Sequence, residues 1–242
     1  MHTEYRYVLN EADIDHSVRA IVVTGQGRSF CVGADSKALE GHVAKGGYDP
    51  GTPIDLIVPG QSAQEEFQAS FAYHFGLTKP VVAAINGPAA GVGLVLACFA
   101  DIRFAVPGIK FTTAHGKLNF PAEYGLSWLL PRMIGLPRAN DLLLTSRVFM
   151  SEEAHEIGLV NRLCDPEALL RETYEYVQLM IETVSPASLR ETRWQVYRDL
   201  HRDVASAVVN SEELIDEMSR QKDYQEGISA FVEKRKPNWT GE

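Results

Sequence analysis

Apolar residues along this chain follow two kinds of pattern. Short uninterrupted runs rich in valine, isoleucine and alanine occur at residues 20–24 and 80–85, which predicts fully buried strands. Longer stretches place apolar residues three or four positions apart, which predicts helices with one buried face. Strands alternate with helices in the first half and a helical region follows, so the pattern indicates an α/β protein.

Further elements follow from the same periodicities. Short strands are expected at residues 102–106 and 110–113, and helices at residues 3–16, 34–43, 62–75, between the second glycine-rich turn and Phe99, and from residue 127 onward. Phe67, Phe71 and Phe75 are spaced four apart, which predicts a stripe that faces the core. Residues 44–60 contain three prolines and are expected to form an irregular loop over the site.

One apolar stretch could be mistaken for a membrane span. Residues 81–100 carry no charged side chain over twenty positions, which is long enough to cross a bilayer. Residues 86–88, Asn-Gly-Pro, interrupt it, and Gly91 and Gly93 follow. A buried strand, a turn and a buried helix therefore explain it better. With no signal peptide at the first residues, we expect a soluble, cytoplasmic protein with no membrane contact.

Charge and cysteine content exclude several kinds of function. The formal net charge of −9 repels phosphate backbones, and no basic stripe offsets it, so no nucleic-acid partner is expected. Cys31, Cys98 and Cys164 are odd in number and lack paired spacing, which suits a reducing cytoplasm. No His, Cys and carboxylate cluster has the spacing of a metal site, so no metal is expected.

Small residues follow both valine-rich runs, and these two turns carry the candidate chemistry. They cover residues 27–35 and 86–93, and each leads into a predicted helix. A strand that ends in small residues exposes backbone N–H groups, and the helix adds its positive end. Two such turns face to face could hold an oxygen that gains negative charge during a reaction. Alternatively, both turns serve only to pack the strands tightly.

These turns and several other pieces, in the same order, carry a resemblance to a known family. The pieces are residues 18–25, 30–35, 79–81, 86–87, 100–102, 130–132, 158–160 and 226–231. Through them the chain resembles the enoyl-CoA hydratase/isomerase (crotonase) superfamily from about residue 4 to about residue 237. The resemblance implies a spiral of ββα units over residues 1–185 and a C-terminal helical region over residues 186–242. That region commonly packs on a neighbouring subunit, which implies a homotrimer or a homohexamer.

The N-terminus departs from the family pattern. Family members usually begin with about two more strands before the first helix, whereas this chain opens at Met1 in that helix. Part of the first sheet, and some contacts to the CoA nucleotide, are therefore expected to be missing.

The resemblance also assigns the oxyanion contacts. They are the backbone N–H groups of Ala34 and Val92, with the thioester carbonyl of an acyl-CoA between them. Enolate charge that develops on this oxygen would be stabilised there.

The acid/base residues decide the reaction. Hydratases of this family use two glutamates, whose positions fall on Val95 and His115 here. Glu123 instead matches the single catalytic glutamate of the Δ3,Δ2-enoyl-CoA isomerase subfamily, which also has a bulky aliphatic residue where Val92 stands. One base that moves a proton from the alpha to the gamma carbon suffices for isomerisation.

Each of these assignments has an alternative. Glu123 could be a surface carboxylate that favours a helix N-terminus. His115 could be a second proton carrier or could merely fill space, and Tyr124 could orient the base or only pack. Asp35 could be a structural cap, and Lys234 a solvated charge on a helix.

Substrate contacts are implied at two places. Near the turns they are Val32, Asp35, Lys37, Gly91 and Tyr124. In the tail, Phe231 and Lys234 would contact the CoA of the same or an adjacent subunit. Coenzyme A enters as part of the substrate, and no separate cofactor is expected.

Three functions follow from this sequence. The favoured one is isomerisation of an enoyl-CoA with Glu123 as acid/base. The second is an enoyl-CoA hydratase, or a hydrolase of acyl-CoA or β-diketone type, that uses His115 and Glu123. The third is an acyl-CoA-binding homologue without catalytic activity.

Overall fold

The computed structural model describes residues 1–34, 36–48, 58–60 and 67–241. Its strands are β1 (Ile21–Thr24), β2 (Val81–Ile85), β3 (Ala89–Ala90), β4 (Ile102–Ala105), β5 (Lys110–Thr112), β6 (Phe149–Met150) and β7 (Arg162–Leu163). Its α-helices are α1 (His2–Ile14), α2 (Ser36–Lys45), α3 (Tyr73–Gly76), α4 (Val92–Phe99), α5 (Leu126–Ile134), α6 (Leu136–Thr145), α7 (Ser151–Glu156), α8 (Leu169–Thr183), α9 (Pro186–Arg198), α10 (Val204–Met218) and α11 (Lys222–Glu233). The 3₁₀ turns among the described residues include η2 (His115–Leu118), η3 (Glu123–Gly125) and η4 (Asp199–His201).

The main sheet has four parallel strands in the order β1-β2-β4-β7. All five residues of β2 are buried, because both faces of this strand are covered. Val81, Ala83 and Ile85 belong to the large core that includes α4, whereas Ala84 packs with Leu169 of α8 on the other face. Burial on both faces explains why the valine-rich run is uninterrupted rather than alternating.

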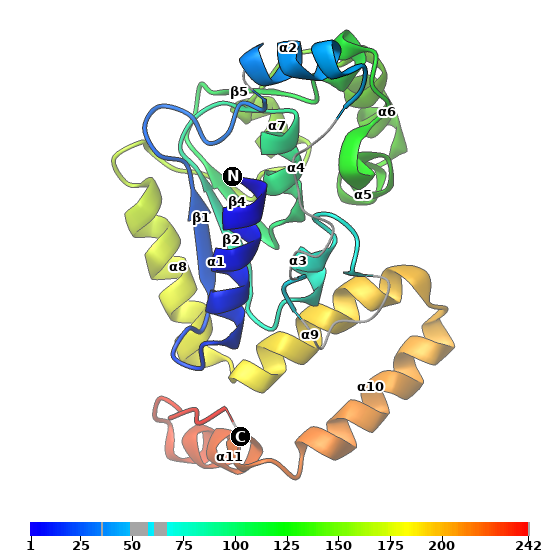
Figure 1. The fold of residues 1–242 in the computed structure, drawn as a ribbon. Helices are drawn as coiled ribbons and strands as arrows, with labels where there is room; N and C mark the ends of the chain where they lie inside the picture. Colours follow the sequence, from blue (N-terminus) through cyan, green and yellow to red (C-terminus); the bar gives the residue numbers. More distant parts are fainter. Residues whose placement is uncertain (35, 49–57, 61–66, 242) are drawn as a thin grey trace.

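The chain builds this sheet and a second one together. The second sheet has the order β3-β5-β6. The chain passes from β2 to β3 and into α4, and then from β4 to β5, so each pass adds one strand to each sheet. The expected α/β spiral of ββα units with a helical C-terminal region is therefore the fold that the structure has (Figure 1).

One predicted helix is wrong. Residues 62–66 of the helix expected over 62–75 lie outside the described residues, and residues 67–72 are turns and short irregular structure. The chain becomes α-helical only at Tyr73, and Phe71 has a left-handed backbone with φ of 63°. Phe67, Phe71 and Phe75 are nevertheless all buried. The spacing of four therefore predicted correctly that the three rings are buried. It did not predict the backbone conformation, which follows the packing of the rings.

The loop expected over residues 44–60 is described only in part, because residues 49–57 lie outside the described residues. Helix α2 continues to Lys45, two residues past its expected end. Among the helices that the structure describes, none is both long and apolar enough to cross a membrane.

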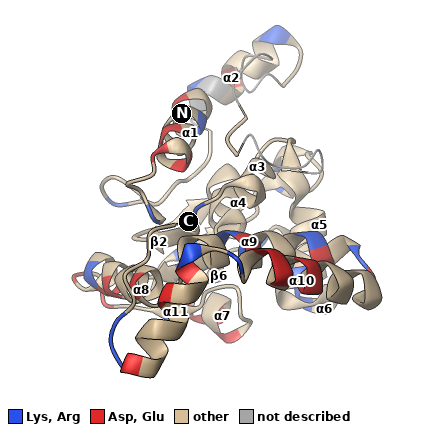
Figure 2. Ribbon diagram, turned by 90° about the horizontal axis from the view of Figure 1, so that it is seen from below, with Lys and Arg blue, Asp and Glu red and all other residues tan. Residues whose placement is uncertain are grey.

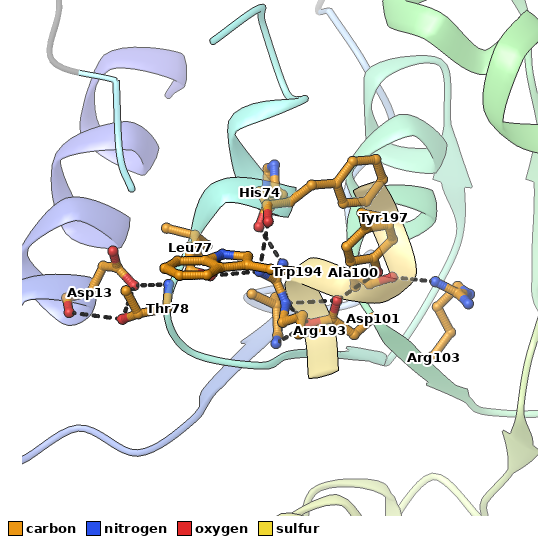
Figure 3. A network of polar contacts seen from close by, with 12 residues as sticks. Asp13, His74, Leu77, Thr78, Ala100, Asp101, Arg103, Arg193, Trp194 and Tyr197 are labelled. Carbon is orange, nitrogen blue, oxygen red and sulfur yellow. Dashed lines mark hydrogen bonds and ion pairs between the residues drawn. The ribbon is translucent and has the colours of Figure 1, made fainter. Parts of the chain in front are cut away.

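A buried arginine docks α9 on the core (Figure 3). The Arg193 side chain is 5% exposed, and its Nε donates to the carboxylate of Asp101 at 2.7 and 2.9 Å. Its Nη1 donates to the carbonyls of Phe75 and Leu77, and its Nη2 donates to the carbonyl of His74. Asp101 also accepts from the backbone N–H of Val81 and from the hydroxyl of Tyr197. This network joins α9 to the ends of α3 and α4.

Beyond α9 the chain forms an arm that leaves the body, made of α10 and α11 (Figure 1). Four acidic residues and no lysine or arginine lie on α10, which appears red along part of its length in Figure 2. The arm therefore adds to the negative charge of the chain and would repel a phosphate backbone.

Candidate active site

The two glycine-rich turns lie against each other at the carboxyl ends of β1 and β2. The amide of Ala90 donates to the carbonyl of Cys31 at 2.9 Å, and Cys31 forms a parallel bridge with Ala89. A Cβ atom on Gly93 would stand only 1.8 Å from the Cys31 oxygen. Because this contact is with backbone, only glycine allows the first turn of α4 to approach so closely.

Asn86 fixes the first turn to the second through its side chain. Its Nδ2 donates to the carbonyls of Gly25 and Gly27 at 3.0 Å, and its Oδ1 accepts from the Gly25 amide at 3.0 Å. A Cβ atom on Gly87 would lie 2.2 Å from the carbonyl of Arg28. Both turns are therefore held in a single arrangement by backbone contact and one amide side chain.

The two candidate oxyanion amides lie at the ends of these turns. Val92 is the first residue of α4, and Gly91 before it has φ of 52°. Within the part of the chain that the structure describes, no acceptor engages the backbone N–H of Ala34 or Val92. The helix dipole adds partial positive charge at Val92. Each of these amides is thus available to donate a hydrogen bond, as the predicted oxyanion site requires.

Glu123 lies over the second turn. A Cβ atom on Gly91 would stand 3.8 Å from Glu123 Oε2, which places the carboxylate beside the residue that precedes the Val92 amide. Among the described residues, none donates a hydrogen bond to this carboxylate. Glu123 is half-buried, and that burial raises its pKa above the usual range of a carboxyl group. A raised pKa makes the ionised carboxylate a stronger base.

The backbone after Glu123 turns this side chain out of the following helix. Tyr124 has φ of 46°, and Gly125 has φ of 83°, so the two residues form a left-handed turn before α5. The Tyr124 hydroxyl lies 2.6 Å from that of Tyr48, and its ring meets the Phe71 ring edge-on at 4.9 Å. Tyr124 thus fixes the loop that carries Glu123 and does not hydrogen-bond to its carboxylate.

His115 is buried at the start of η2, and its Nδ1 has no hydrogen-bond partner among the described residues. In the described ranges of the chain, no hydrogen bond joins His115 to Glu123. Val95, at the other hydratase position, is fully buried in α4. Of the three candidate acid/base positions, 95, 115 and 123, only Glu123 therefore carries a carboxylate.

The remaining predicted contacts near the turns have exposed positions. Val32 is 57% exposed, and Lys37 is exposed on α2. Asp35 lies outside the described residues. Val32 and Lys37 are thus free to meet a substrate that approaches from solvent.

Phe231 and Lys234 lie elsewhere in the molecule. Phe231 is 84% exposed on α11, and Lys234 ends that helix with φ of 54°. Helix α11 lies at the opposite end of the molecule from α2 (Figure 1). The fold therefore does not bring these two residues to the turns of their own chain.

An apolar cavity of about 490 Å³ adjoins the loop of Glu123. Its described lining comprises Phe67, Ala69, Ser70, Ala72, Phe75, Phe99, Tyr124, Gly125, Trp128 and His201. Phe67 and Phe75, from the stripe that the sequence predicted to face the core, form part of this wall. No sequence signal pointed to His201, which reaches the cavity from η4 and stacks on Trp128 at 5.2 Å.

A larger cavity of about 720 Å³ lies between the end of α1 and the start of α9. Arg19 and Lys79, which line it, precede β1 and β2, so it opens at the amino ends of the strands. Ligands of open parallel sheets bind at the carboxyl ends, where the turns and Glu123 lie. Among the described residues, no group of three or more His, Cys, Asp or Glu side chains could hold a metal ion.

Comparison with known proteins gives a consistent result. A family model described as enoyl-CoA hydratase/isomerase matches residues 1–242. The chain is 31% identical to 1,2-epoxyphenylacetyl-CoA isomerase of Escherichia coli (strain K12), with 100% of this chain and 88% of that protein covered. It is 35% identical to the probable enoyl-CoA hydratase EchA12 of Mycobacterium tuberculosis (strain ATCC 25618 / H37Rv), over 96% of this chain and 80% of that one.

Solved structures agree. A probable enoyl-CoA hydratase/isomerase from Mycobacterium abscessus superposes with a TM-score of 0.85 at 27% identity, covering 100% of this chain and 88% of that chain. An enoyl-CoA hydratase from Bacillus anthracis superposes with a TM-score of 0.84 at 27% identity, covering 99% of this chain and 88% of that chain.

Proposed function

Because the chain belongs to the enoyl-CoA hydratase/isomerase family, we propose that it acts on acyl-CoA thioesters and that its reaction is double-bond isomerisation of an enoyl-CoA. The observation that carries this proposal is the position of Glu123, whose Oε2 lies beside Gly91 at the start of α4. The carboxylate is thereby close to the amide that would bind the thioester oxygen.

The proposed reaction moves one proton. The thioester oxygen accepts hydrogen bonds from the amides of Ala34 and Val92, and Glu123 removes a proton from the alpha carbon. The electron pair of the broken C–H bond delocalises onto the thioester oxygen, where the amides stabilise it, and through the adjacent double bond to the gamma carbon. Glu123 then returns the proton to the gamma carbon, and a 3-enoyl thioester has become a 2-enoyl thioester. No electrons leave the substrate, so the coenzyme A that it carries is the only cofactor the reaction needs.

The residues at the two hydratase glutamate positions favour isomerisation over hydration. Addition of water across a double bond in this family employs two carboxylates, and here Val95 and His115 occupy those positions. Val95 cannot accept a proton. A hydratase or hydrolase that pairs His115 with Glu123 is the second candidate, and the unpartnered Nδ1 of His115 among the described residues favours it.

The C-terminal arm supports an assembly of several copies. Val204, Ile215 and Phe231 are 80%, 68% and 84% exposed on α10 and α11, and apolar side chains exposed in this way commonly mark an interface. We propose that the arm packs on a neighbouring subunit in a homotrimer or homohexamer. Phe231 and Lys234 would then contact CoA in that neighbour's site, since they lie far from their own.

Two substrates separate these functions. The protein is incubated with a 3-enoyl-CoA and, separately, with a 2-enoyl-CoA, and the absorbance of the conjugated thioester is followed. A gain of conjugation from the 3-enoyl-CoA supports isomerisation. Loss of conjugation from the 2-enoyl-CoA supports hydration. Binding of both esters without either change would support an acyl-CoA-binding protein that lacks catalysis.

A further inference from the structure

The apolar cavity beside Glu123 is placed to hold the far end of an acyl group. Tyr124 and Gly125, which directly follow Glu123, form part of its wall. A Cβ atom on Gly125 would lie 3.9 Å from the Phe99 ring. Phe99 ends α4 and Val92 begins it, so one helix connects the candidate oxyanion amide with a wall of the cavity.

The length of that helix sets the reach that an acyl group needs. At 1.5 Å of rise per residue, Phe99 lies about 10 Å along α4 from Val92. Three carbon–carbon bonds, each about 1.5 Å long, cannot cover this distance, so a four-carbon acyl group stops short of Phe99. A phenyl ring on the fifth carbon does reach it.

The cavity wall is aromatic. Phe99 meets Phe75 with ring centroids 5.0 Å apart and tilted by 41°, and Phe75 meets Phe67 edge-on at 6.1 Å. On another side, Trp128 stacks on His201. A further ring could join these pairs, because aromatic pairs prefer edge-to-face or offset contacts.

The described wall of the cavity also lacks these four kinds of charged side chain: lysine, arginine, aspartate and glutamate. A carboxylate at the end of the acyl group would lose its hydration and would meet neither a lysine nor an arginine among the described residues of this wall. An uncharged ring, by contrast, gains contact with several aromatic neighbours.

We infer that the acyl group of the preferred substrate ends in an uncharged aromatic ring, which docks among Phe75, Phe99 and Trp128. This inference rests on the proposed function for the position of the thioester, and it adds the class of acyl group. The carbonyl stays at the turns while the ring occupies the cavity, of which Phe99 at the far end of α4 is one wall.

Binding of saturated thioesters tests the inference separately from catalysis, because such esters cannot isomerise. The probes are 5-phenylpentanoyl-CoA, 5-cyclohexylpentanoyl-CoA and pentanoyl-CoA, and the affinity of each is measured by calorimetry. The cyclohexyl ester matches the phenyl ester in reach and size but has no aromatic face. We expect the phenyl ester to bind roughly two- to tenfold more tightly than the cyclohexyl ester, and pentanoyl-CoA to bind most weakly.

Other orders of affinity overturn the inference. Equal or tighter binding of the cyclohexyl ester would show that the cavity offers only apolar volume. Equal binding of all three esters would show that the acyl group does not enter the cavity. A phenyl preference without any isomerisation of 5-phenyl-3-pentenoyl-CoA would leave the aromatic site in place and remove the proposed reaction.

Substitutions in the cavity wall test whether the phenyl ring of the ester docks there. Trp128→Leu keeps an apolar side chain but removes the aromatic face, so the ratio of phenyl to cyclohexyl affinity should fall to about one. Phe75→Leu provides a second, independent test from another wall. Tyr174→Leu, at a tyrosine that is 57% exposed on α8, is the matched control and should keep the ratio of the unmodified protein. A ratio unchanged in both wall variants would overturn the assignment.

Discussion

At the scale of single residues, Glu123 combines two properties that a catalytic base needs. It is half-buried beside Gly91, and no described residue occupies its carboxylate with a hydrogen bond. Desolvation disfavours the charged form and so raises its pKa, which strengthens it as a base.

The raised pKa of Glu123 predicts the pH dependence of the reaction. The base must be ionised before it can remove a proton, so kcat/KM for a 3-enoyl-CoA should increase as pH rises through the pKa of Glu123. The inflection should lie above the ordinary carboxyl value of about 4.3. Initial rates measured from about pH 4 to about pH 8 give this profile. A rate that declines with rising pH across this range would show that the required form is an acid.

The sequence predicted part of this site. Glu123 and the two turns stood in short local motifs, and the structure brings both turns into backbone contact and Glu123 to Gly91. The convergence of the Ala34 and Val92 amides on one oxygen stays a prediction, as do the roles of His115 and the CoA contacts. Tyr48, which meets Tyr124 through its hydroxyl, could not be predicted because 76 residues separate them.

At the scale of elements, buried strands were the easiest to predict. Ile21–Thr24 and Val81–Ile85 begin one residue after their expected starts, because a strand covered on both faces requires an unbroken apolar run. The helix expected at 62–75 failed over residues 67–72, where Phe67 and Phe71 are buried at a helical spacing without helical backbone. The packing of Phe71 against Phe99 and Tyr124 depends on contacts far along the chain.

The contact between the turns depends on Gly93. We predict that Gly93→Ala destabilises the protein by about 1–3 kcal/mol or more, because the added methyl group meets the Cys31 carbonyl oxygen. Forcing the turns apart should also abolish activity. Gly41→Ala is the control, since nothing lies within 4 Å of a Cβ there, and alanine in a helix is favoured by about 0.5–1 kcal/mol. Urea unfolding measures both variants. Equal stability of Gly93→Ala and the unmodified protein would contradict the close contact.

The docking of α9 depends on Arg193. Arg193→Met should cost about 3–5 kcal/mol of unfolding free energy, because it leaves the largely buried carboxylate of Asp101 without its cation. Adding Asp101→Asn should recover part of this loss, since the two sites share one interaction. Arg220→Ala, in an exposed ion pair on the arm, should change stability by less than about 1 kcal/mol. A loss as small for Arg193→Met as for Arg220→Ala would rule out the buried pair as the anchor of α9.

At the scale of the whole molecule, a buried histidine links folding to pH. His74 is fully buried, with Nδ1 donating to the Phe71 carbonyl and Nε2 accepting from the Tyr5 hydroxyl, which fits the neutral ring. Burial lowers its pKa from 6.5 to about 4. Between these values the unfolded chain binds more protons than the folded one, so stability falls as pH falls.

His74 should lower the free energy of unfolding by roughly 3 kcal/mol as the pH falls from 6.5 to about 4. Urea unfolding at several pH values measures it. His74→Gln should flatten the dependence above pH 5, where few carboxylates titrate, whereas His16→Gln, at an exposed histidine, should leave the slope unchanged. An unaltered slope in His74→Gln would exclude His74 as the source of acid sensitivity.

The fold, the family and the position of Glu123 together support one chemical role, in which a single carboxylate moves a proton over an enolate. Glu123→Gln tests this role most directly, because glutamine keeps the size of the side chain and cannot act as a base. We predict that the rate of 3-enoyl-CoA isomerisation falls by about 10²–10⁴-fold, while the affinity for a saturated acyl-CoA changes little. An isomerisation rate equal to that of the unmodified protein would contradict the assignment of Glu123 as the base.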